Sequence, residues 1–394
     1  MKILQIPYWY PPEGGEFCRD QAVLLKKSGV EIDVLANVPA PWRKYGLGVF
    51  TKFPVHPFFS KEDNLDVLRN YFWRIPKSEK HNVNRWIKKT LKLVDLYIEE
   101  KGMPDIIHTH VALWAGYVGF LVKKKYNIPY VVTEHHSIFS NKSEFSRSSF
   151  KSWQLKYLTS VFSNADYILP VSTVIVDKIN EFSNNNPNLC VISNILDNQF
   201  FTYKKREFCR NTFVFFTANS YCLDKAYDVL LEAFEIVCKQ NRNVELRIAG
   251  TNFDNPVIKR LLAENKNSRN KIVFCGFLSQ TEVRDELWNA DAFVLASRAE
   301  SQSIATIEAL CTGLPIVCTE VVPEEVAIPT AGYCGVSVDN PQALADAMLM
   351  MMENYKKFDS LAISNHAHKI TDPNLFVEKT KKVYVSVLDT KRSL

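Results

Sequence analysis

Two glutamates eight positions apart could hold a ligand that carries hydroxyl groups beside a phosphate. Glu300 lies in a short polar loop after the apolar run Ala292–Ala296, and Glu308 lies in the apolar segment IATIEALCTG. A helix that starts near Ser303 leaves backbone N–H groups free around Gln302–Ile304, and free N–H groups at a helix start bind anions. A carboxylate repels phosphate but accepts hydrogen bonds from the vicinal diol of a ribose or a hexose. This order of groups fits a nucleotide sugar.

The apolar setting of Glu308 favours this interpretation over a simpler one. Two glutamates on one helix are usually just part of a solvated face. Here Ile307, Ala309 and Leu310 flank Glu308, and a carboxylate placed among apolar side chains needs a polar partner. We therefore expect both glutamates to bind a ligand.

Apolar strand-like runs alternate with amphipathic helical runs along the chain. In the first half, the expected strands are Lys2–Pro7, Glu31–Ala36, Asp105–Thr109, Tyr130–Thr133, Asp166–Pro170 and Leu189–Ser193. The expected helices between them are Phe17–Lys27, Asn84–Lys101, Leu113–Lys125, Trp153–Asn164 and Val174–Phe182. Strands that are nearly all apolar and are separated by helices form parallel sheets covered on both faces.

The pattern restarts near residue 213 and predicts a second domain of the same kind. The expected strands there are Phe213–Thr217, Val244–Ala249, Ile272–Phe274, Ala292–Ala296, Pro315–Cys318 and Gly335–Val338. Two tandem, doubly wound, Rossmann-like α/β domains fit this order, with residues 1–200 in the first domain and 201–370 in the second. The polar stretch Asp197–Arg210 contains the boundary. Residues 371–394 form a last helix, which we expect to pack back toward the first domain.

The stretch from Asp291 to Glu320 resembles the E-x7-E motif of the retaining glycosyltransferases of family 4. Glu300 and Glu308 occupy the two motif positions, and the sequence E-A-L-x-x-G-L-P follows as it does in the family. The family usually has Gly-Phe-Gly after the first glutamate, whereas this chain has Ser301-Gln302-Ser303. The segment FFTANSYCLDKAYDVLLEAF resembles the family's strand, loop and K-G-x-D-x-L-L-x-A-F helix. The resemblance implies the GT-B fold, in which two such domains face each other across a cleft.

The resemblance also implies a set of donor-binding residues. Lys225 matches the family lysine that contacts the diphosphate. The family often has an arginine about five residues earlier, where this chain has Asn219 and Ser220, and Arg298 is our candidate for the missing charge. The turn Gly276-Phe277-Leu278 would meet the base. The full expected donor-binding set is Gly14, Gly15, Asn219, Ser220, Lys225, Gly276, Phe277, Leu278, Glu300, Gln302, Ser303, Ile304 and Glu308.

Two histidine-bearing segments of the first domain complete the expected site. PDIIHTHVALWAG resembles the family's P-D-x-x-H-x-H segment, and PYVVTEHHS resembles its P-x-V-x-T-x-H segment. His135 matches the histidine that contacts the transferred sugar, and we expect His110 to face the cleft. The expected catalytic residues are His135, Lys225 and Glu300. The expected acceptor-binding residues are His110, Glu134 and His136.

The implied activity is transfer of a hexose, with retention of configuration, from a nucleotide diphosphate sugar to a glycan or lipid-linked glycan in surface polysaccharide synthesis. Family frequency favours UDP over GDP as the carrier. We find no D-x-D motif and no metal-ligand spacing among the eight histidines, so we expect neither a metal nor a cofactor. Two other interpretations stay open: a nucleotide-sugar 2-epimerase and a non-catalytic sugar-nucleotide-binding homologue.

Composition limits the partners of the chain. The formal net charge of +5 is too small to predict nucleic-acid binding. There is no apolar run of about 18 residues, so we expect no transmembrane helix. Nine cysteines without a C-x-x-C pair favour reduced thiols in the cytoplasm. The helix Asn84–Lys101 carries a basic side that is either solvated or in peripheral contact with the anionic inner face of the membrane: Arg85, Lys88, Lys89 and Lys92.

Overall fold

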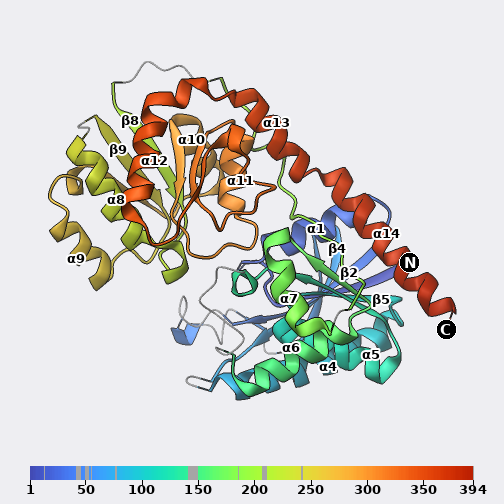
Figure 1. Cartoon of the computed structure of the whole chain (residues 1–394). Helices are drawn as coiled ribbons and strands as arrows, with labels where there is room; N and C mark the ends of the chain where they lie inside the picture. Colours follow the sequence, from blue (N-terminus) through green and yellow to red (C-terminus); the bar gives the residue numbers. More distant parts are fainter. Residues whose placement is uncertain are drawn as a thin grey trace.

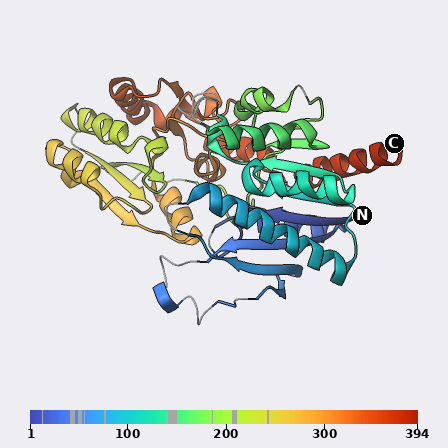
Figure 2. The ribbon, with the colours of Figure 1, turned by 90° about the horizontal axis from the view of Figure 1, so that it is seen from below.

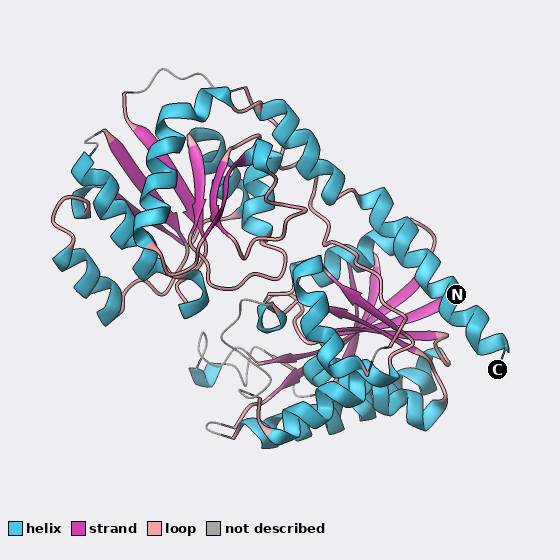
Figure 3. Ribbon diagram, in the orientation of Figure 1, coloured by secondary structure: helices cyan, strands magenta, loops and turns pink. Residues whose placement is uncertain are grey.

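The chain folds into two α/β units that lie side by side in the computed structural model (Figure 1). The structure describes residues 1–12, 14–40, 46–48, 53–54, 56–75, 78–140, 150–184, 186–205, 211–240 and 243–393. The predicted boundary segment, Asp197–Arg210, is therefore described as far as residue 205. Each unit has one central sheet with helices on both faces (Figure 3), which confirms the α/β fold class expected from the alternating pattern.

The first unit is built on a seven-stranded sheet in the order β3-β4-β2-β1-β5-β6-β7. All neighbouring strands are parallel except β3 and β4, which are antiparallel. The strands are β1 (Lys2–Pro7), β2 (Glu31–Pro39), β3 (Phe58–Glu62), β4 (Leu65–Phe72), β5 (Ile106–His110), β6 (Tyr130–Glu134) and β7 (Tyr167–Pro170). The helices are α1 (Glu16–Lys27), α4 (Glu79–Lys101), α5 (Tyr117–Tyr126), α6 (Ser152–Asn164) and α7 (Val176–Ser183), and the short helical turns are η1 (Gly46–Gly48), η2 (Ala112–Gly116), η3 (Ser137–Phe139) and η5 (Thr173–Ile175).

The second unit has a six-stranded parallel sheet in the order β10-β9-β8-β11-β12-β13. The strands are β8 (Phe213–Ala218), β9 (Val244–Ala249), β10 (Ile272–Gly276), β11 (Ala292–Leu295), β12 (Ile316–Thr319) and β13 (Gly332–Val336). The helices are α8 (Tyr227–Gln240), α9 (Pro256–Glu264), α10 (Gln280–Asn289), α11 (Ile304–Cys311), α12 (Pro341–Asn354) and α13 (Ser360–Ile370), and the turns are η6 (Leu223–Lys225), η7 (Arg269–Lys271), η8 (Pro329–Ala331) and η9 (Tyr355–Lys357). This order reverses between β8 and β11, where doubly wound sheets bind ligands beyond the strand ends.

The C-terminal helix α14 (Pro373–Ser393) leaves the second unit and packs along the first (Figure 1; Figure 2). Four buried side chains of α14 pack in one cluster with residues of α1 and β2. They are Phe376, Val383, Tyr384 and Val387. The Tyr384 hydroxyl lies 2.6 Å from Nδ1 of His108 in β5. Because α14 belongs to the core of one unit and is continuous with the helices of the other, it fastens the two units together.

Helix α4 uses its apolar side in the core of the first unit. Trp86, Val94 and Tyr97 are at most 1% exposed, and they pack in the large cluster under the sheet. Of the basic residues predicted for its polar side, Lys88 and Lys92 are exposed and Lys89 is half-buried, whereas Arg85 donates to the Trp73 carbonyl at 3.1 Å. The described part of the chain contains no helix that is long and apolar enough to cross a membrane.

The predicted strand Leu189–Ser193 is wrong, and two strands were not predicted. Residues near Leu189 form only an isolated bridge to Ile168 of β7. Strands β3 and β4 carry charged residues that mask their apolar pattern. Arg69 of β4 is only 5% exposed, and it lies inside the unit because its guanidinium pairs with Glu62 of β3 at 2.5 Å.

Candidate functional site

The Ser301-Gln302-Ser303 segment lies where the two units meet. The side-chain oxygen of Gln302 accepts hydrogen bonds from the Asn194 backbone N–H at 3.0 Å and side-chain amide at 2.7 Å. Asn194 in turn accepts one from Gln21 of α1 at 2.9 Å. The Ser172 hydroxyl donates to the Ser301 carbonyl. The Gln302 side-chain oxygen therefore joins the two units, whereas its buried side-chain nitrogen has no described partner. Its backbone N–H, which was predicted to bind the donor, stays available for a ligand.

Lys225 and Glu300 form an ion pair. Lys225 ends the turn η6 after β8, and Glu300 lies in the loop after β11, so both stand beyond carboxyl ends of neighbouring strands. The Lys225 ammonium lies 2.6 Å from Glu300 Oε1. Glu300 is only 4% exposed, and a carboxylate at that depth needs such a partner. The structure thus brings together two residues that were predicted separately as catalytic.

Arg298 does not supply a free charge for a phosphate. Its guanidinium pairs with Asp339 at 2.6 Å and with Asp228 at 2.7 Å, and it donates to the Leu223 carbonyl at 2.8 Å. Two carboxylates already hold this guanidinium, so the structure gives no support to our prediction that Arg298 replaces the missing family arginine. Its bond to Leu223 instead supports the turn that presents Lys225.

Helix α11 begins at a strained residue and carries an unpaired carboxylate. Ser303, its N-cap, has a left-handed backbone with φ of 63°, where a side chain costs roughly 1–2 kcal/mol relative to glycine. The Ser303 carbonyl accepts the first helical bonds from Thr306 and Ile307, and the N–H groups before them are free of described acceptors. The Glu308 side chain has no hydrogen-bond partner among the described residues, and burial raises the pKa of its carboxyl to about 7. The helix start and this carboxylate can together receive an anion and a diol.

The remaining predicted donor residues of the second unit lie in turns after β8 and β10. The Asn219 carbonyl accepts a bond from the Tyr227 hydroxyl, and its buried side-chain nitrogen has no described partner. The Ser220 hydroxyl lies 2.9 Å from that of Thr251. Gly276 has a left-handed backbone with φ of 71°. The next two residues differ in burial: Phe277 is 81% exposed, whereas Leu278 packs on the core.

Gly14 and Gly15 shape the first strand-to-helix turn of the first unit. Both have positive φ, 92° and 83°. A Cβ on Gly15 would come within 2.4 Å of the Trp9 backbone, whereas one on Gly14 would meet nothing within 4 Å. Gly15 is therefore required by close packing, and Gly14 leaves open space in the turn, as a ligand-binding loop would.

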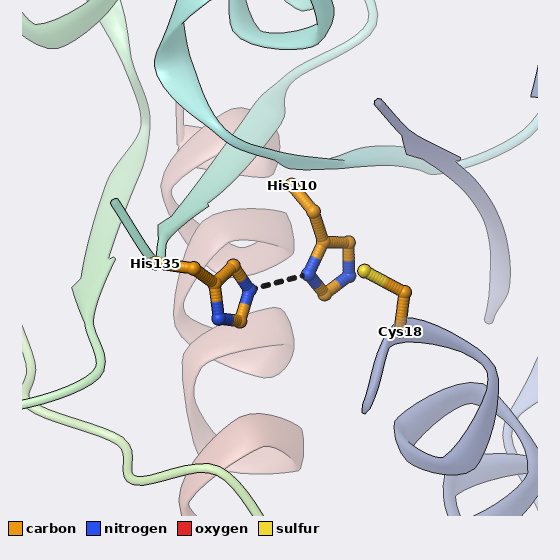
Figure 4. A group of neighbouring side chains, drawn as sticks. All are labelled: Cys18, His110 and His135. Atoms are coloured by element: carbon orange, nitrogen blue, oxygen red, sulfur yellow. Dashed lines mark hydrogen bonds between the residues drawn. The ribbon is translucent and has the colours of Figure 1, made fainter. Parts of the chain in front are cut away.

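Three side chains meet around the predicted sugar-contacting histidine (Figure 4). Nδ1 of His110 lies 2.9 Å from Nε2 of His135, and their rings stack with centroids 5.2 Å apart. The Cys18 sulfur of α1 lies on the other side of His110. His110, predicted to face the cleft, is instead fully buried, because α1 covers it. It contacts His135 directly, and its contact with an acceptor stays a prediction.

The same trio is a group of described residues that could hold a metal ion, since its ligand atoms lie within 4.8 Å of one another. Burial lowers the pKa of His135 to about 3 and raises that of the Cys18 thiol. The imidazoles are therefore neutral, as ligands must be, but a thiol must lose its proton to bind zinc. A bound zinc ion would itself favour loss of this proton, so the trio leaves metal independence a prediction.

Glu134 and His136 differ in what they can reach. Glu134 is fully buried, and its carboxylate accepts backbone N–H bonds from Ala112 at 2.8 Å, His135 at 3.0 Å and His136 at 2.9 Å. It therefore positions the loops after β5 and β6, and acceptor contact would require it to leave these donors. The His136 ring is partly exposed and lines a cavity with Trp9 and other aromatic residues.

Two family models match the chain, and together they span most of it. The model described as Glycosyltransferase Family 4 matches residues 15–200, and the model described as Glycosyl transferases group 1 matches residues 210–354. The chain is a glycosyltransferase of family 4. This family membership confirms the resemblance seen in the E-x7-E motif.

Relatives of this family 4 glycosyltransferase cover nearly its whole length. It is 26% identical to the putative teichuronic acid biosynthesis glycosyltransferase TuaC of Bacillus subtilis over 88% of both chains. Its fold matches the sucrose-phosphate synthase of Thermosynechococcus elongatus with a TM-score of 0.79, at 15% identity over 99% of this chain and 100% of the other. It also matches Anabaena HepE in complex with UDP and glucose, with a TM-score of 0.69, at 15% identity over the full length of both. These matches confirm the GT-B fold.

Most residues that line a cavity of the first unit were not predicted from the sequence as candidate site residues, and His136 is the exception. A cavity of about 240 Å³ in the first unit is lined by residues that follow four strands: Tyr8, Trp9, Arg74, Glu79, Val111, Leu113, Trp114, His136, Ile138 and Phe139. The aromatic run after β1, Tyr8-Trp9-Tyr10, was the available signal, because large side chains directly after a strand stand at the ligand-binding edge of the sheet.

Glu134 should make the stability of this glycosyltransferase depend on pH. Burial raises the pKa of Glu134 to about 7, so between about pH 4.5 and 7 the native state holds a proton that the unfolded chain has lost, and stability falls as pH rises through this window. We expect wild type to lose about 1–3 kcal/mol relative to Glu134→Gln across it. Melting temperatures of wild type and Glu134→Gln from about pH 5 to about pH 8 measure this difference. The histidines are the same in both proteins, so their contributions cancel in the comparison. A difference that stays constant would show that Glu134 remains ionised.

Proposed function

We propose that this glycosyltransferase moves a hexose, with retention of configuration, from a UDP-sugar to a glycan or lipid-linked glycan, without a metal. The observation that carries the proposal is the arrangement around α11: free N–H groups at its start, Glu308 with no described partner, and the Lys225–Glu300 pair beside them. A nucleoside diphosphate sugar has the matching groups: an anionic diphosphate, with the ribose diol on one side of it and the hexose hydroxyls on the other. The fold match to Anabaena HepE, a protein solved with UDP and glucose, supports UDP as the carrier.

The residues have separate roles in the proposed reaction. Glu308 binds the ribose diol, and the start of α11 together with Lys225 stabilises the charge that develops on the departing diphosphate. Glu300 and His135 contact the transferred hexose. The acceptor hydroxyl attacks the anomeric carbon from the side that the diphosphate leaves, the C–O bond to the phosphate breaks, and the leaving phosphate takes the hydroxyl proton. Configuration is thereby retained.

The relative named for teichuronic acid biosynthesis supports surface polysaccharide synthesis as the setting. The proposal includes a cytoplasmic location, with the acceptor reached at the inner face of the membrane. The eight described cysteines are free thiols, as that compartment favours.

Incubation with UDP-sugars, with and without acceptor glycans and in the presence of EDTA, tests the proposed function. We expect UDP release that depends on the acceptor, a glycoside product whose anomeric configuration by NMR equals that of the donor, and the same rate with the chelator. A new sugar nucleotide formed without acceptor would indicate the 2-epimerase instead. UDP-sugar binding without turnover would indicate a non-catalytic homologue.

The basic side of α4 is a candidate for peripheral membrane contact. Because its apolar side is buried in the core of the first unit, membrane contact would be electrostatic. Each basic residue near an anionic surface would then contribute about 1 kcal/mol. Reversing charge at Lys88 and Lys89 to glutamate should abolish cosedimentation with anionic liposomes. The matched control reverses Lys266 and Arg269 in the second unit. Unchanged sedimentation of the α4 variant would show that this side is only solvated.

A further inference from the structure

The cavity of the first unit lies at the carboxyl edge of its sheet. Tyr8 and Trp9 follow β1, Arg74 follows β4, and Trp114 and His136 follow β5 and β6. Doubly wound sheets bind their ligands at this edge. His136 is adjacent in sequence to His135, the residue we place on the transferred sugar. The cavity is therefore next to the proposed reaction centre but separate from the donor residues of the second unit.

The walls of the cavity are aromatic and are held in a strained backbone. The Tyr8 ring lies 4.9 Å from that of Trp114, and the Trp9 ring lies 6.1 Å from that of His136. Val111 and Trp114 both have positive φ, 76° and 74°, which is costly for a β-branched or bulky residue. Strain of this kind persists where the surroundings enforce it, often at binding sites. Here the bond from the Ala112 N–H to the buried Glu134 carboxylate enforces it.

The mouth of the cavity carries one cation that no described carboxylate neutralises. Arg74 and Glu79 are both exposed lining residues. Glu79 is paired with Lys151 at 2.5 Å, so its charge is already balanced. The Arg74 guanidinium has the Trp114 ring as its described neighbour, with its carbon 5.7 Å from the ring centroid. A ligand in the cavity would thus meet aromatic faces and, at one end, a guanidinium that is paired with no carboxylate in the described part of the chain.

We propose that this cavity binds the terminal pyranose of the acceptor, and that Arg74 selects a pyranose that carries a carboxylate or phosphate group. The inference rests on the proposed function. A pyranose ring has an apolar face of C–H groups that packs on aromatic side chains, and its hydroxyls can reach the Glu79 carboxylate and the Tyr8 hydroxyl. A guanidinium binds carboxylate and phosphate through paired N–H bonds. The acceptor class is therefore an acidic glycan, whose anion comes from a uronic acid or from a sugar phosphate.

Binding of small glycosides to the full-length protein in the presence of UDP tests this selection. The probes are methyl glucoside, methyl glucuronide and glucose 6-phosphate, followed by tryptophan fluorescence at low ionic strength. We expect at least one anionic probe to bind about tenfold more tightly than methyl glucoside, a difference of the size that one charge-assisted contact provides. Whichever anionic probe binds more tightly identifies the source of the anion.

The variant Arg74→Gln should remove the preference, so that the anionic probes bind no more tightly than methyl glucoside. The matched control is Lys80→Gln, which removes an exposed charge on the same helix that carries Glu79 but does not line the cavity, and it should keep the preference. Equal binding of all three probes to wild type, or a preference that survives in Arg74→Gln, would overturn the inference. The donor assay separates the two proposals: if UDP-sugar turnover occurs without any anionic preference, only the acceptor inference fails, and if no UDP-sugar is bound or turned over, the proposed function fails.

Discussion

Replacing Lys225 with methionine should lower kcat by about 10²–10³-fold, the usual cost of removing one preorganised positive group from a developing anion. In the structure this ammonium lies 2.6 Å from Glu300, and its side chain retains 22% exposure, so it can also reach a phosphate. Methionine keeps an unbranched apolar stem and removes the ammonium, with its charge and its hydrogen-bond donors. The measurement is steady-state UDP release with a saturating donor, beside the affinity for UDP.

The partner Glu300 complicates this prediction, since removing Lys225 leaves a buried carboxylate unpaired. The double variant Lys225→Met with Glu300→Gln removes both charges and should recover melting temperature without recovering kcat. Lys239→Met, which removes an exposed lysine at the end of α8, is the matched control and should keep full activity. Full turnover in Lys225→Met, or recovery of turnover in the double variant, would refute a role for the ammonium in stabilising the leaving group.

The fold and the strand-end positions could be predicted because their signals are local. Parallel strands buried on both faces are continuous apolar runs, so the strands that carry His135, Lys225 and Glu300 were visible in the sequence. Strand β4 was missed because Asp66 and Arg69 interrupt its apolar pattern, and Arg69 is tolerated inside only through its bond to Glu62. That compensation depends on a neighbouring strand, which the pattern of one strand cannot show.

The contacts within the site are tertiary and could not be predicted from spacing. The Lys225–Glu300 pair joins residues 75 positions apart, and the bond between Asn194 and Gln302 joins positions 108 apart. Gln302 stands where a donor residue was expected, but its side-chain oxygen accepts hydrogen bonds from Asn194 across the junction of the units. Arg298 is a second case. Its position suggested a phosphate contact, but in the structure its guanidinium is paired with two aspartates.

The departures from the family pattern changed side chains but kept backbone shape. Ser303 stands at the last glycine of the family's Gly-Phe-Gly, and Ala226 stands at the glycine of its K-G-x-D motif. Both have left-handed backbones, with φ of 63° and 46°. Non-glycine residues there cost free energy, so the surrounding fold must enforce the turns. The start of α11 thus keeps the backbone shape of the family motif even though its glycines are replaced.

Glu308→Gln should weaken UDP binding about 10–100-fold above pH 7, because a neutral amide replaces a carboxylate in charge-assisted bonds to the ribose diol. The two side chains have nearly the same shape, and Glu308 has no described hydrogen bond to lose, so the fold should be unaffected. Glu232→Gln removes an exposed carboxylate from α8 of the same unit and should leave UDP affinity unchanged. Isothermal titration calorimetry measures the UDP affinity of wild type and of both variants.

The pH dependence of that affinity distinguishes a ribose contact from a packing effect. Burial raises the pKa of Glu308 to about 7, so in the free protein its carboxyl is partly protonated near neutrality. Hydrogen bonds from a diol favour the ionised form and lower this pKa. Binding of UDP to wild type should therefore release protons near pH 7 and weaken as pH falls below it, beyond the change that phosphate titration causes in Glu308→Gln. Equal proton release by wild type and the variant would mean that Glu308 does not meet the carrier, and the diol role would have to pass to another carboxylate of the cleft.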